Sequence, residues 1–351
     1  MGCVPWVPRL PPKLEPGAQV AVVSPSFAAP AIGPQVHEQA MRRIRDDLGL
    51  EPVEYPTTRR LNAAAADRAA DLTAAFTDPD IRAVFATIGG DDQITVLSLL
   101  DPDAILADPK PYFGFSDNTN LLNWLWFHGA AAYHGGSTQI HLGRGAGLHP
   151  VSVESLRAAL FESVDLDLTE VDAYVEDEIE WTDPAALTTT APAQPASGWT
   201  WHQPARVVSG PTWGGNLEIL SWTLAVSRYV RPASDYAGCI LLIETSEEMP
   251  KAEEVFRMLR NMGERGLLSQ FPAVIVGRPK ASVFFDVRTP EQRVQYRIDQ
   301  RAAVLRAFAA YHPDAMIVFD VDLGHTDPQW VVPYGGRMTI DGPQRRIVAH
   351  Y

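Results

Sequence analysis

Three polar residues follow apolar runs that are typical of buried strands, and their types could perform nucleophilic catalysis. Ser116 follows "YFGF", Glu244 ends "CILLIE", and His325 follows "MIVFDVDLG". A serine hydroxyl is a weak nucleophile unless a neighbouring base takes its proton, and histidine can do so near neutral pH. A carboxylate can then hold the imidazole in the required tautomer and stabilise the imidazolium. The three residues therefore predict a catalytic triad that attacks an acyl carbon.

The surroundings of Ser116 partly match a nucleophile elbow, G-x-S-x-G. In "GFSDN" the first glycine is present, whereas Asn118 stands in place of the last. A sharp turn from strand to helix would place Ser116 at a helix N-terminus, where free backbone N–H groups can stabilise an oxyanion. The N–H of Asp117 is one predicted donor. The pair Gly89 and Gly90 in "TIGG" could supply a second, because glycine lets the backbone approach a ligand closely.

Each of these residues also has an ordinary structural interpretation. Ser116 suits the N-cap of a helix, and the two glycines suit a turn. Glu244 could belong to a solvated acidic cluster with Glu247 and Glu248, and His325 in "LGHTDP" could be a loop histidine. The joint occurrence of three such residues at strand ends favours the catalytic interpretation without excluding the structural one.

Composition narrows the function classes. The chain has 351 residues and a formal net charge of −14, which argues against nucleic acid as a partner because phosphate binding needs clustered Lys and Arg. Hydrophobic residues make up 46% of the chain, enough for the cores of two domains. The N-terminal residues lack the apolar region of a signal peptide, and no stretch approaches the length of a membrane span. We expect a soluble cytoplasmic protein that does not bind a membrane.

The sequence lacks motifs for several other chemistries. Its two cysteines, Cys3 and Cys239, form neither a disulfide framework nor a metal-ligand set. His134, His141 and His149 lack the H-E-x-x-H spacing of a zinc site, and we interpret them as loop histidines. There is no P-loop, and the glycine turns do not match the dinucleotide-binding fingerprint. We therefore expect no metal and no organic cofactor.

Short apolar runs alternate with helical patterns, which predicts an α/β fold with a mostly parallel sheet. In the first half, strands are predicted at "AQVAVV", "EPVEY", "IRAVFA" and "PYFGFS", with helices at 35–50, 63–79 and 92–101. In the second half, strands are predicted at "ARVVSG", "CILLIE", "FPAVIVG" and "MIVFD", with a glycine turn at "TWGGN" and helices at 251–268 and 291–311. Ligands of such sheets bind beyond the carboxyl ends of strands, where "TIGGDD" and "GFSDNT" lie.

The character of the sequence changes between the two halves. From about Glu162 it is rich in acids and then in Pro, Ala and Thr, which predicts a linker and a mobile loop. The predicted division is a disordered or extended start, an N-terminal α/β domain with the nucleophile, a linker with a Trp-containing loop, and a C-terminal domain with the Glu and His: 1–16, 17–160, 161–205 and 206–351.

Five motifs together resemble the family of LD-carboxypeptidases and microcin C immunity proteins. They are "TIGGDD", "GFSDNTNLL", "GPTWGGNLEIL", "LLIETSEE" and "DLGHTDPQWVVPYG", in the family's order and across most of the chain. The resemblance implies a serine peptidase whose triad is Ser116, Glu244 and His325, with the backbone N–H groups of Gly90 and Asp117 as oxyanion donors. It also implies a flavodoxin-like N-terminal domain, a C-terminal domain containing a small β-barrel, and a homodimer.

Two branches of this family act on different substrates. The microcin C immunity branch cleaves the bond between a C-terminal aspartate and a modified nucleotide, which confers antibiotic resistance. The LD-carboxypeptidase branch removes the terminal D-Ala from the murein tetrapeptide during cell-wall recycling. The long tryptophan-containing loop favours the first branch, because aromatic faces can stack a purine base. A third alternative is a non-catalytic binding protein on the same scaffold.

Four residues are candidates for substrate binding: Gly89, Trp181, Trp201 and Asn216. The two tryptophans could instead anchor the loop to the core. The acidic run at 176–180 would repel an anionic nucleotide if it lay close to the substrate.

Overall fold

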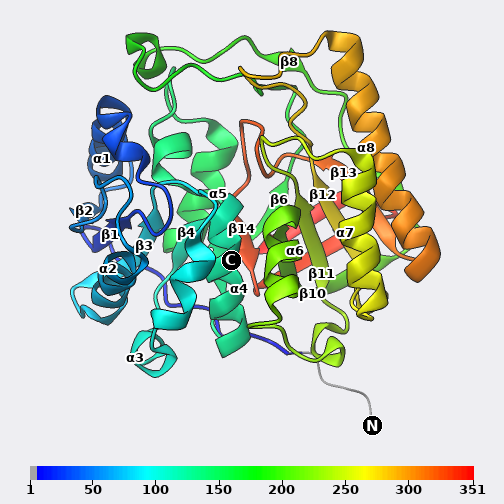
Figure 1. Cartoon of the computed structure of the whole chain (residues 1–351), viewed down its shortest axis with the longest axis horizontal. Helices are drawn as coiled ribbons and strands as arrows, with labels where there is room; N and C mark the ends of the chain where they lie inside the picture. Colours follow the sequence, from blue (N-terminus) through cyan, green and yellow to red (C-terminus); the bar gives the residue numbers. More distant parts are fainter. Residues whose placement is uncertain (1–5) are drawn as a thin grey trace.

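The computed structural model describes residues 6–351, so Cys3 lies outside the described part of the chain. The architecture is mixed α/β, as predicted, with one six-stranded sheet and one eight-stranded sheet. Figure 1 shows α1 (Pro34–Asp46) and α2 (Ala65–Thr77) at one end of the molecule and α7 (Ala252–Glu264) and α8 (Pro290–Tyr311) at the other.

The first sheet contains β1 (Gln19–Val23), β2 (Glu51–Glu54), β3 (Ile81–Ala86), β4 (Tyr112–Gly114), β5 (Ala132–His134) and β14 (Val332–Tyr334). Its strand order is β14-β5-β4-β3-β1-β2, and β1 to β5 are all parallel. The order β2-β1-β3-β4-β5 is that of a flavodoxin-like sheet. The sixth strand, β14, pairs antiparallel with β5.

Both faces of this sheet are covered by helices, which explains why its central strands are mostly apolar on both faces. On one side, Val20 and Val22 of β1 share a core with α1 and α5 (Pro150–Phe161). On the other, Ala21 and Val23 share a core with α2 and α4 (Thr119–His128).

The second sheet contains β6 (Asp165–Leu168), β9 (Thr200–His202), β10 (Val207–Asn216), β11 (Ile240–Glu244), β12 (Ala273–Gly277), β13 (Met316–Val321), β15 (Arg337–Asp341) and β16 (Arg346–His350). Strands β10 to β13 are parallel, and the others join antiparallel in the order β6-β16-β15-β10-β11-β12-β13-β9. Helices α6 (Leu217–Val226), α7 and α8 share one core with this sheet. Among the described residues β6 does not pair with β9, so the small β-barrel stays a prediction.

Two of the predicted elements are wrong. Residues 92–101 form the short 3-10 turns η2 (Gln93–Thr95) and η3 (Leu97–Leu99) instead of one α-helix. The glycines of "TWGGN" do not make a turn but continue β10. A Cβ atom on Gly214 would overlap the carbonyl oxygen of Leu242, so glycine here allows β10 to approach β11.

The segment predicted as a linker and mobile loop also contributes to the sheets. It supplies the edge strands β6 and β9 of the second sheet, and a separate hairpin of β7 (Ala173–Tyr174) and β8 (Gln194–Pro195). Figure 1 shows much of this green segment crossing the top of the molecule. Strand β14 lies in the predicted C-terminal domain, yet it is an edge strand of the first sheet. Sheet membership therefore crosses the predicted domain boundaries.

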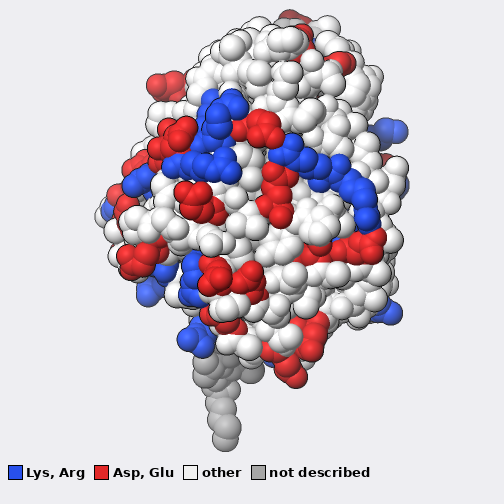
Figure 2. Space-filling model, turned by 90° about the vertical axis from the view of Figure 1, so that its left-hand side faces the viewer, with Lys and Arg blue, Asp and Glu red and all other residues white. Residues whose placement is uncertain are grey.

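The charged surface over the first sheet is mixed in sign. Figure 2 shows this face with basic and acidic side chains interspersed. Ion pairs in this half of the chain include Arg59 with Glu38 and Glu54, and Arg60 with Asp67. Within residues 6–351, no helix combines the length and the apolar character that a membrane crossing requires.

Trp213 of β10 connects the two sheets through the core. Its side chain is 1% exposed, and its ring stacks on Phe271 with centroids 5.8 Å apart. Its indole N–H donates a hydrogen bond of 2.9 Å to Asn123 Oδ1 on α4, a helix that packs on the first sheet. Trp213 therefore links the two halves of the chain both by packing and by a hydrogen bond.

We expect Trp213→Ala to lower the free energy of unfolding by about 3–5 kcal/mol, because it leaves a cavity and an unpaired amide oxygen. The matched control is Trp222→Ala on α6, whose side chain is 39% exposed and should lose clearly less. Denaturant unfolding of both variants measures the difference. Equal losses would contradict the connecting role of Trp213.

Candidate active site

Ser116 lies in a sharp turn between β4 and α4. Phe115 is fully extended, with φ −150° and ψ −173°, and Ser116 then takes the left-handed φ of 60°. Residues Ser116–Asn118 form a 3-10 turn that leads into α4. A left-handed serine is strained and persists only where its surroundings fix it. This turn has the strand-to-helix form of a nucleophile elbow.

Asn118, which departs from the elbow motif, ties this turn to the neighbouring strand end. Its Nδ2 donates to the carbonyl oxygens of Ile88 and Phe115, both at 3.0 Å. Its Oδ1 accepts hydrogen bonds from Gln93 Nε2 at 2.8 Å and from the Tyr112 hydroxyl at 2.6 Å. The side chain is fully buried, so these four bonds satisfy an amide that burial would otherwise make costly.

Asp117 fixes the same region from its other side. Its buried carboxylate accepts hydrogen bonds from Ser26 Oγ at 2.5 Å, Gln93 N at 2.9 Å and Asn120 Nδ2 at 2.7 Å. Burial raises the pKa of this carboxyl above its usual value, although the three donors oppose the shift. Three loops are thereby held around Ser116: those after β1, after β3 and after β4.

Gly89 lies directly against this turn, and Gly90 follows it. A Cβ atom on Gly89 would be 2.8 Å from Ser116 Oγ and 3.1 Å from the backbone nitrogen of Asp117. Gly90 has a φ of 152°, and a Cβ atom there would overlap the hydroxyl of Ser26. Among the described residues, the N–H groups of Gly90 and Asp117 have no hydrogen-bond acceptor. Gly89 therefore brings the backbone next to Ser116, whereas Gly90 packs against Ser26 in the loop after β1.

The structure brings Ser116, Glu244 and His325 together, although they come from different sheets. His325 Nε2 lies 3.1 Å from Ser116 Oγ, and His325 Nδ1 lies 2.6 Å from Glu244 Oε2. The ring of Phe115 contacts the His325 ring edge-on, with centroids 5.1 Å apart. The three side chains thus form one continuous hydrogen-bonded series.

Glu244 is buried and tightly enclosed. Its side chain is 1% exposed, and its Oε1 lies 3.9 Å from Nε2 of His134, which is too long for a hydrogen bond. Cβ atoms on Gly277 or Gly324 would come within 2.9 Å and 2.7 Å of Glu244 Cβ, so only glycine fits at these positions. Burial opposes ionisation, but His325 and His134 outweigh it and lower the pKa of Glu244 to about 2.

Glu247 is a second carboxylate on His325. Its Oε2 lies 3.1 Å from His325 Nε2, the same nitrogen that faces Ser116. Burial disfavours the charged imidazole, but Glu244 and Glu247 together raise the pKa of His325 to about 10. From the sequence, Glu247 was predicted only as a member of an acidic cluster, without a role in the site. Its position three residues after Glu244, in the loop beyond β11, is the one signal that could have singled it out.

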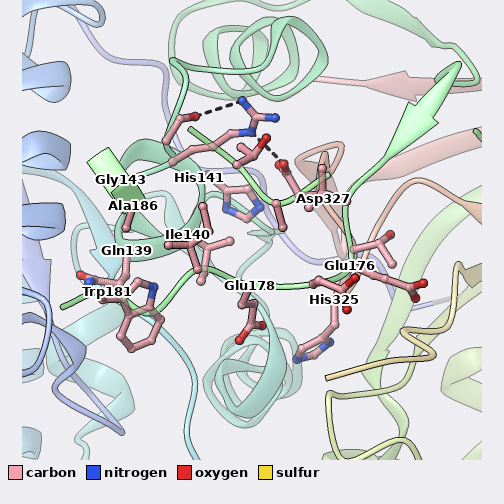
Figure 3. Close-up of a pocket in the computed structure, with 18 of the residues that line it drawn as sticks. Gln139, Ile140, His141, Gly143, Glu176, Glu178, Trp181, Ala186, His325 and Asp327 are labelled. Atoms are coloured by element: carbon pink, nitrogen blue, oxygen red, sulfur yellow. Dashed lines mark hydrogen bonds and ion pairs between the residues drawn. The ribbon is translucent and has the colours of Figure 1, made fainter. Parts of the chain in front are cut away.

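A pocket opens beside His325 and reaches into the tryptophan-containing segment. Its walls include Phe115, Gln139, His141, Trp181, Lys280 and Asp327. Figure 3 shows Trp181 and His325 at opposite sides of this pocket. Trp181 also packs closely against Gly33, where a Cβ atom would be 2.6 Å from the Trp181 Cβ. Trp181 therefore lies where a ligand that extends from His325 would reach.

Two substrate-binding candidates lie elsewhere. Trp201 is in edge strand β9, paired with β13, and packs on the core of the second sheet with Arg345 over its ring. It does not line the pocket, because strand pairing directs it to that core. Asn216 is buried at the start of α6, where its Oδ1 accepts the Ile219 N–H at 3.0 Å as an N-cap. It lies opposite Glu244 on the neighbouring strand and also outside the pocket wall.

The acidic run at 176–180 is largely neutralised by basic side chains. Glu176 pairs with Arg293 at 2.9 Å and Arg297 at 2.5 Å, and Glu178 pairs with Lys280. The repulsion that this run would exert on a nearby anion is therefore largely compensated. Within residues 6–351, no group of three His, Cys, Asp or Glu side chains is arranged to hold a metal ion.

Comparison with known proteins gives matches to two family models. Residues 20–135 match the model described as the LD-carboxypeptidase N-terminal domain, and residues 209–340 match the LD-carboxypeptidase C-terminal domain.

Individual relatives come from both branches of that family. The murein tetrapeptide carboxypeptidase of Pseudomonas aeruginosa is 26% identical over 341 residues, covering 93% of this chain and 94% of that protein. The microcin C7 self-immunity protein MccF of Escherichia coli is 27% identical over 290 residues, covering 80% of this chain and 77% of that protein. A solved structure of MccF in complex with aspartyl sulfamoyl adenosine has a TM-score of 0.82 at 21% identity, covering 98% and 99% of the two chains, and so shows the same fold.

The contact between Gly89 and Ser116 leads to a structural prediction. In Gly89→Ala the new methyl group must displace Ser116, because a Cβ atom would lie 2.8 Å from its Cβ and Oγ. We expect the distance from Ser116 Oγ to His325 Nε2 to exceed about 3.5 Å, beyond hydrogen bonding, in a crystal structure. Gly17→Ala is the control: at φ 82° alanine is strained there too, but its Cβ atom meets nothing within 4 Å, so it does not push on Ser116. An unchanged distance in Gly89→Ala would show that the turn is not constrained by this contact.

Proposed function

Because the chain belongs to the LD-carboxypeptidase family, we propose that it is a serine carboxypeptidase or amidase whose triad is Ser116, Glu244 and His325. The observation that carries this proposal is the hydrogen-bonded series from Ser116 Oγ through both nitrogens of His325 to Glu244. Such a series provides a nucleophile, a base within reach of its proton, and a carboxylate that orients the base.

In the proposed reaction, Ser116 Oγ attacks the scissile carbonyl carbon while His325 Nε2 takes the hydroxyl proton. The N–H groups of Gly90 and Asp117 donate to the resulting oxyanion. The intermediate collapses, the bond to the leaving group breaks, and His325 returns the proton to that group. A water molecule, activated by the same nitrogen, then hydrolyses the acyl-enzyme and frees Ser116.

For the substrate, we propose an aminoacyl group joined to a modified nucleotide, as in the microcin C immunity branch. Trp181 in the pocket beside His325 supports this choice, because its ring could stack a base. The pairing of Glu176 and Glu178 with basic side chains removes the repulsion that an anionic ligand would otherwise meet. The ligand in the MccF structure, aspartyl sulfamoyl adenosine, has the same chemical form.

A murein peptide is the second candidate substrate. It is favoured by the relative from Pseudomonas aeruginosa, which matches a larger share of this chain than MccF does. Hydrolysis assays with an aminoacyl sulfamoyl adenosine and with a murein tetrapeptide separate the two candidates.

Ser116→Ala tests the mechanism. The variant should lose essentially all turnover while its unfolding transition stays close to that of the wild type, because only one hydroxyl is removed. Ser269→Ala, an exposed serine on η8 (Leu268–Gln270), is the control and should keep full activity. A serine-reactive phosphonate should label Ser116 in the wild-type protein. Wild-type activity in Ser116→Ala would refute the triad, and a chain that neither labels nor turns over would favour a binding protein.

Trp181→Ala tests base stacking. Loss of one stacking face should weaken binding of the nucleotide substrate by about 1–3 kcal/mol, a rise in KM of about 5- to 150-fold. Trp201→Ala is the control, because that tryptophan packs on the second sheet and should leave KM unchanged. If both variants keep the wild-type KM, Trp181 only anchors the loop.

A further inference from the structure

We propose that Glu247 recognises a free ammonium group on the acyl part of the substrate, and that in the free protein the same carboxylate rests on His325. This inference rests on the proposed function and specifies its substrate class. It assigns Glu247 two exclusive partners, one before and one after the substrate binds.

The geometry places Glu247 in competition with Ser116. Glu247 Oε2 and Ser116 Oγ both lie 3.1 Å from His325 Nε2, a nitrogen that carries at most one proton. If that proton points to Glu247, the nitrogen has no lone pair with which to accept the serine proton. The arrangement therefore stabilises an imidazolium between two carboxylates and leaves Ser116 without a base.

The two carboxylates on His325 differ in their freedom to move. The side chain of Glu244 is 1% exposed and enclosed by glycine contacts, whereas the side chain of Glu247 is 49% exposed. Glu247 lies in the loop between β11 and α7. It can leave His325 by rotating its side chain, and Glu244 cannot.

The charges around the pocket show which kind of group would draw Glu247 away from His325, namely a cation. The other acids here already have strong cationic partners: Glu176 with Arg293 and Arg297, Glu178 with Lys280, and Asp327 with Arg144 at 2.8 Å. Within residues 6–351, the cation in ion-pair contact with Glu247 is His325, and Lys280 acts on this carboxylate only from a greater distance. When His325 becomes neutral to act as a base, the Glu247 carboxylate loses its partner and favours another cation.

The substrate can supply that cation in the right place. Ser116 Oγ and Glu247 Oε2 share one nitrogen as neighbour, so they cannot be further apart than the sum of the two distances. In an aminoacyl group, the α-ammonium is attached to the carbon next to the scissile carbonyl. Once that carbonyl meets Ser116, the ammonium lies within reach of Glu247. Binding of such a substrate would then free His325 to act as the base. An N-acylated compound has no ammonium group and would leave Glu247 on His325.

The first experiment measures the base without a substrate. Ser116 is labelled with a neutral fluorophosphonate over a range of pH in the wild type, in Glu247→Gln and in the exposed control Glu248→Gln. Removing the Glu247 charge lowers the pKa of His325, so the rise of the labelling rate should move to lower pH by about one unit or more in Glu247→Gln alone. Glu244, His134, His141, Asp327 and Lys280 surround His325 in all three proteins and stay constant. An identical profile in Glu247→Gln, or an equal shift in Glu248→Gln, would overturn the proposal.

The second experiment measures ammonium recognition. The ratio of kcat/KM for aspartyl sulfamoyl adenosine over its Nα-acetyl derivative should be about tenfold or more in the wild type, since one ion pair is lost. The ratio should approach one in Glu247→Gln and stay unchanged in Glu248→Gln. Turnover with an unaltered ratio in Glu247→Gln contradicts this inference alone. A wild-type protein that neither labels at Ser116 nor hydrolyses any acyl substrate contradicts the proposed function, and this inference with it.

Discussion

The buried contact between Glu244 and His325 sets the main constraint on this structure. An ionised carboxylate away from water is unfavourable unless a cation and hydrogen bonds compensate for the lost hydration. Glu244 obtains both from His325 Nδ1 at 2.6 Å. The contact needs Gly277 and Gly324 beside it, because any larger residue would collide with the Glu244 side chain. The glycines near this site therefore serve close packing around a charge more than chain flexibility.

The contact between His325 and Ser116, in contrast, requires that the two sheets be docked. Ser116 follows a strand of the first sheet, whereas Glu244 and His325 follow strands of the second. The docking is held by Trp213 with Asn123, and by Thr119 Oγ1, which accepts the Asn216 N–H at 3.0 Å. Thr119 begins α4 directly after the Ser116 turn, and Asn216 ends β10 next to Glu244. The groups that fix the interface are thus immediate neighbours of the residues that must meet across it.

Much of this arrangement can be predicted from the sequence, because it depends on local patterns. Apolar runs predicted the parallel strands, and the polar residues at their ends pointed to Ser116, Glu244 and His325. What could not be predicted depends on partners far along the chain. The position of Trp201 follows from pairing between β9 and β13, and the neutralisation of Glu176 follows from arginines on α8. The contact of Glu247 with His325 is of the same kind, since an acidic cluster in sequence does not show which acid turns inward.

The pairing of β14 with β5 bears on the order in which the first sheet and the candidate site are completed during synthesis. Ser116 and the five parallel strands around it leave the ribosome early, but the edge of β5 stays unpaired until β14 emerges. His325 precedes β14 by only a few residues. The strand that closes the sheet and the imidazole proposed to activate Ser116 therefore emerge together. In the proposed mechanism, a nascent chain would therefore hold its nucleophile without a base until His325 and β14 have both emerged.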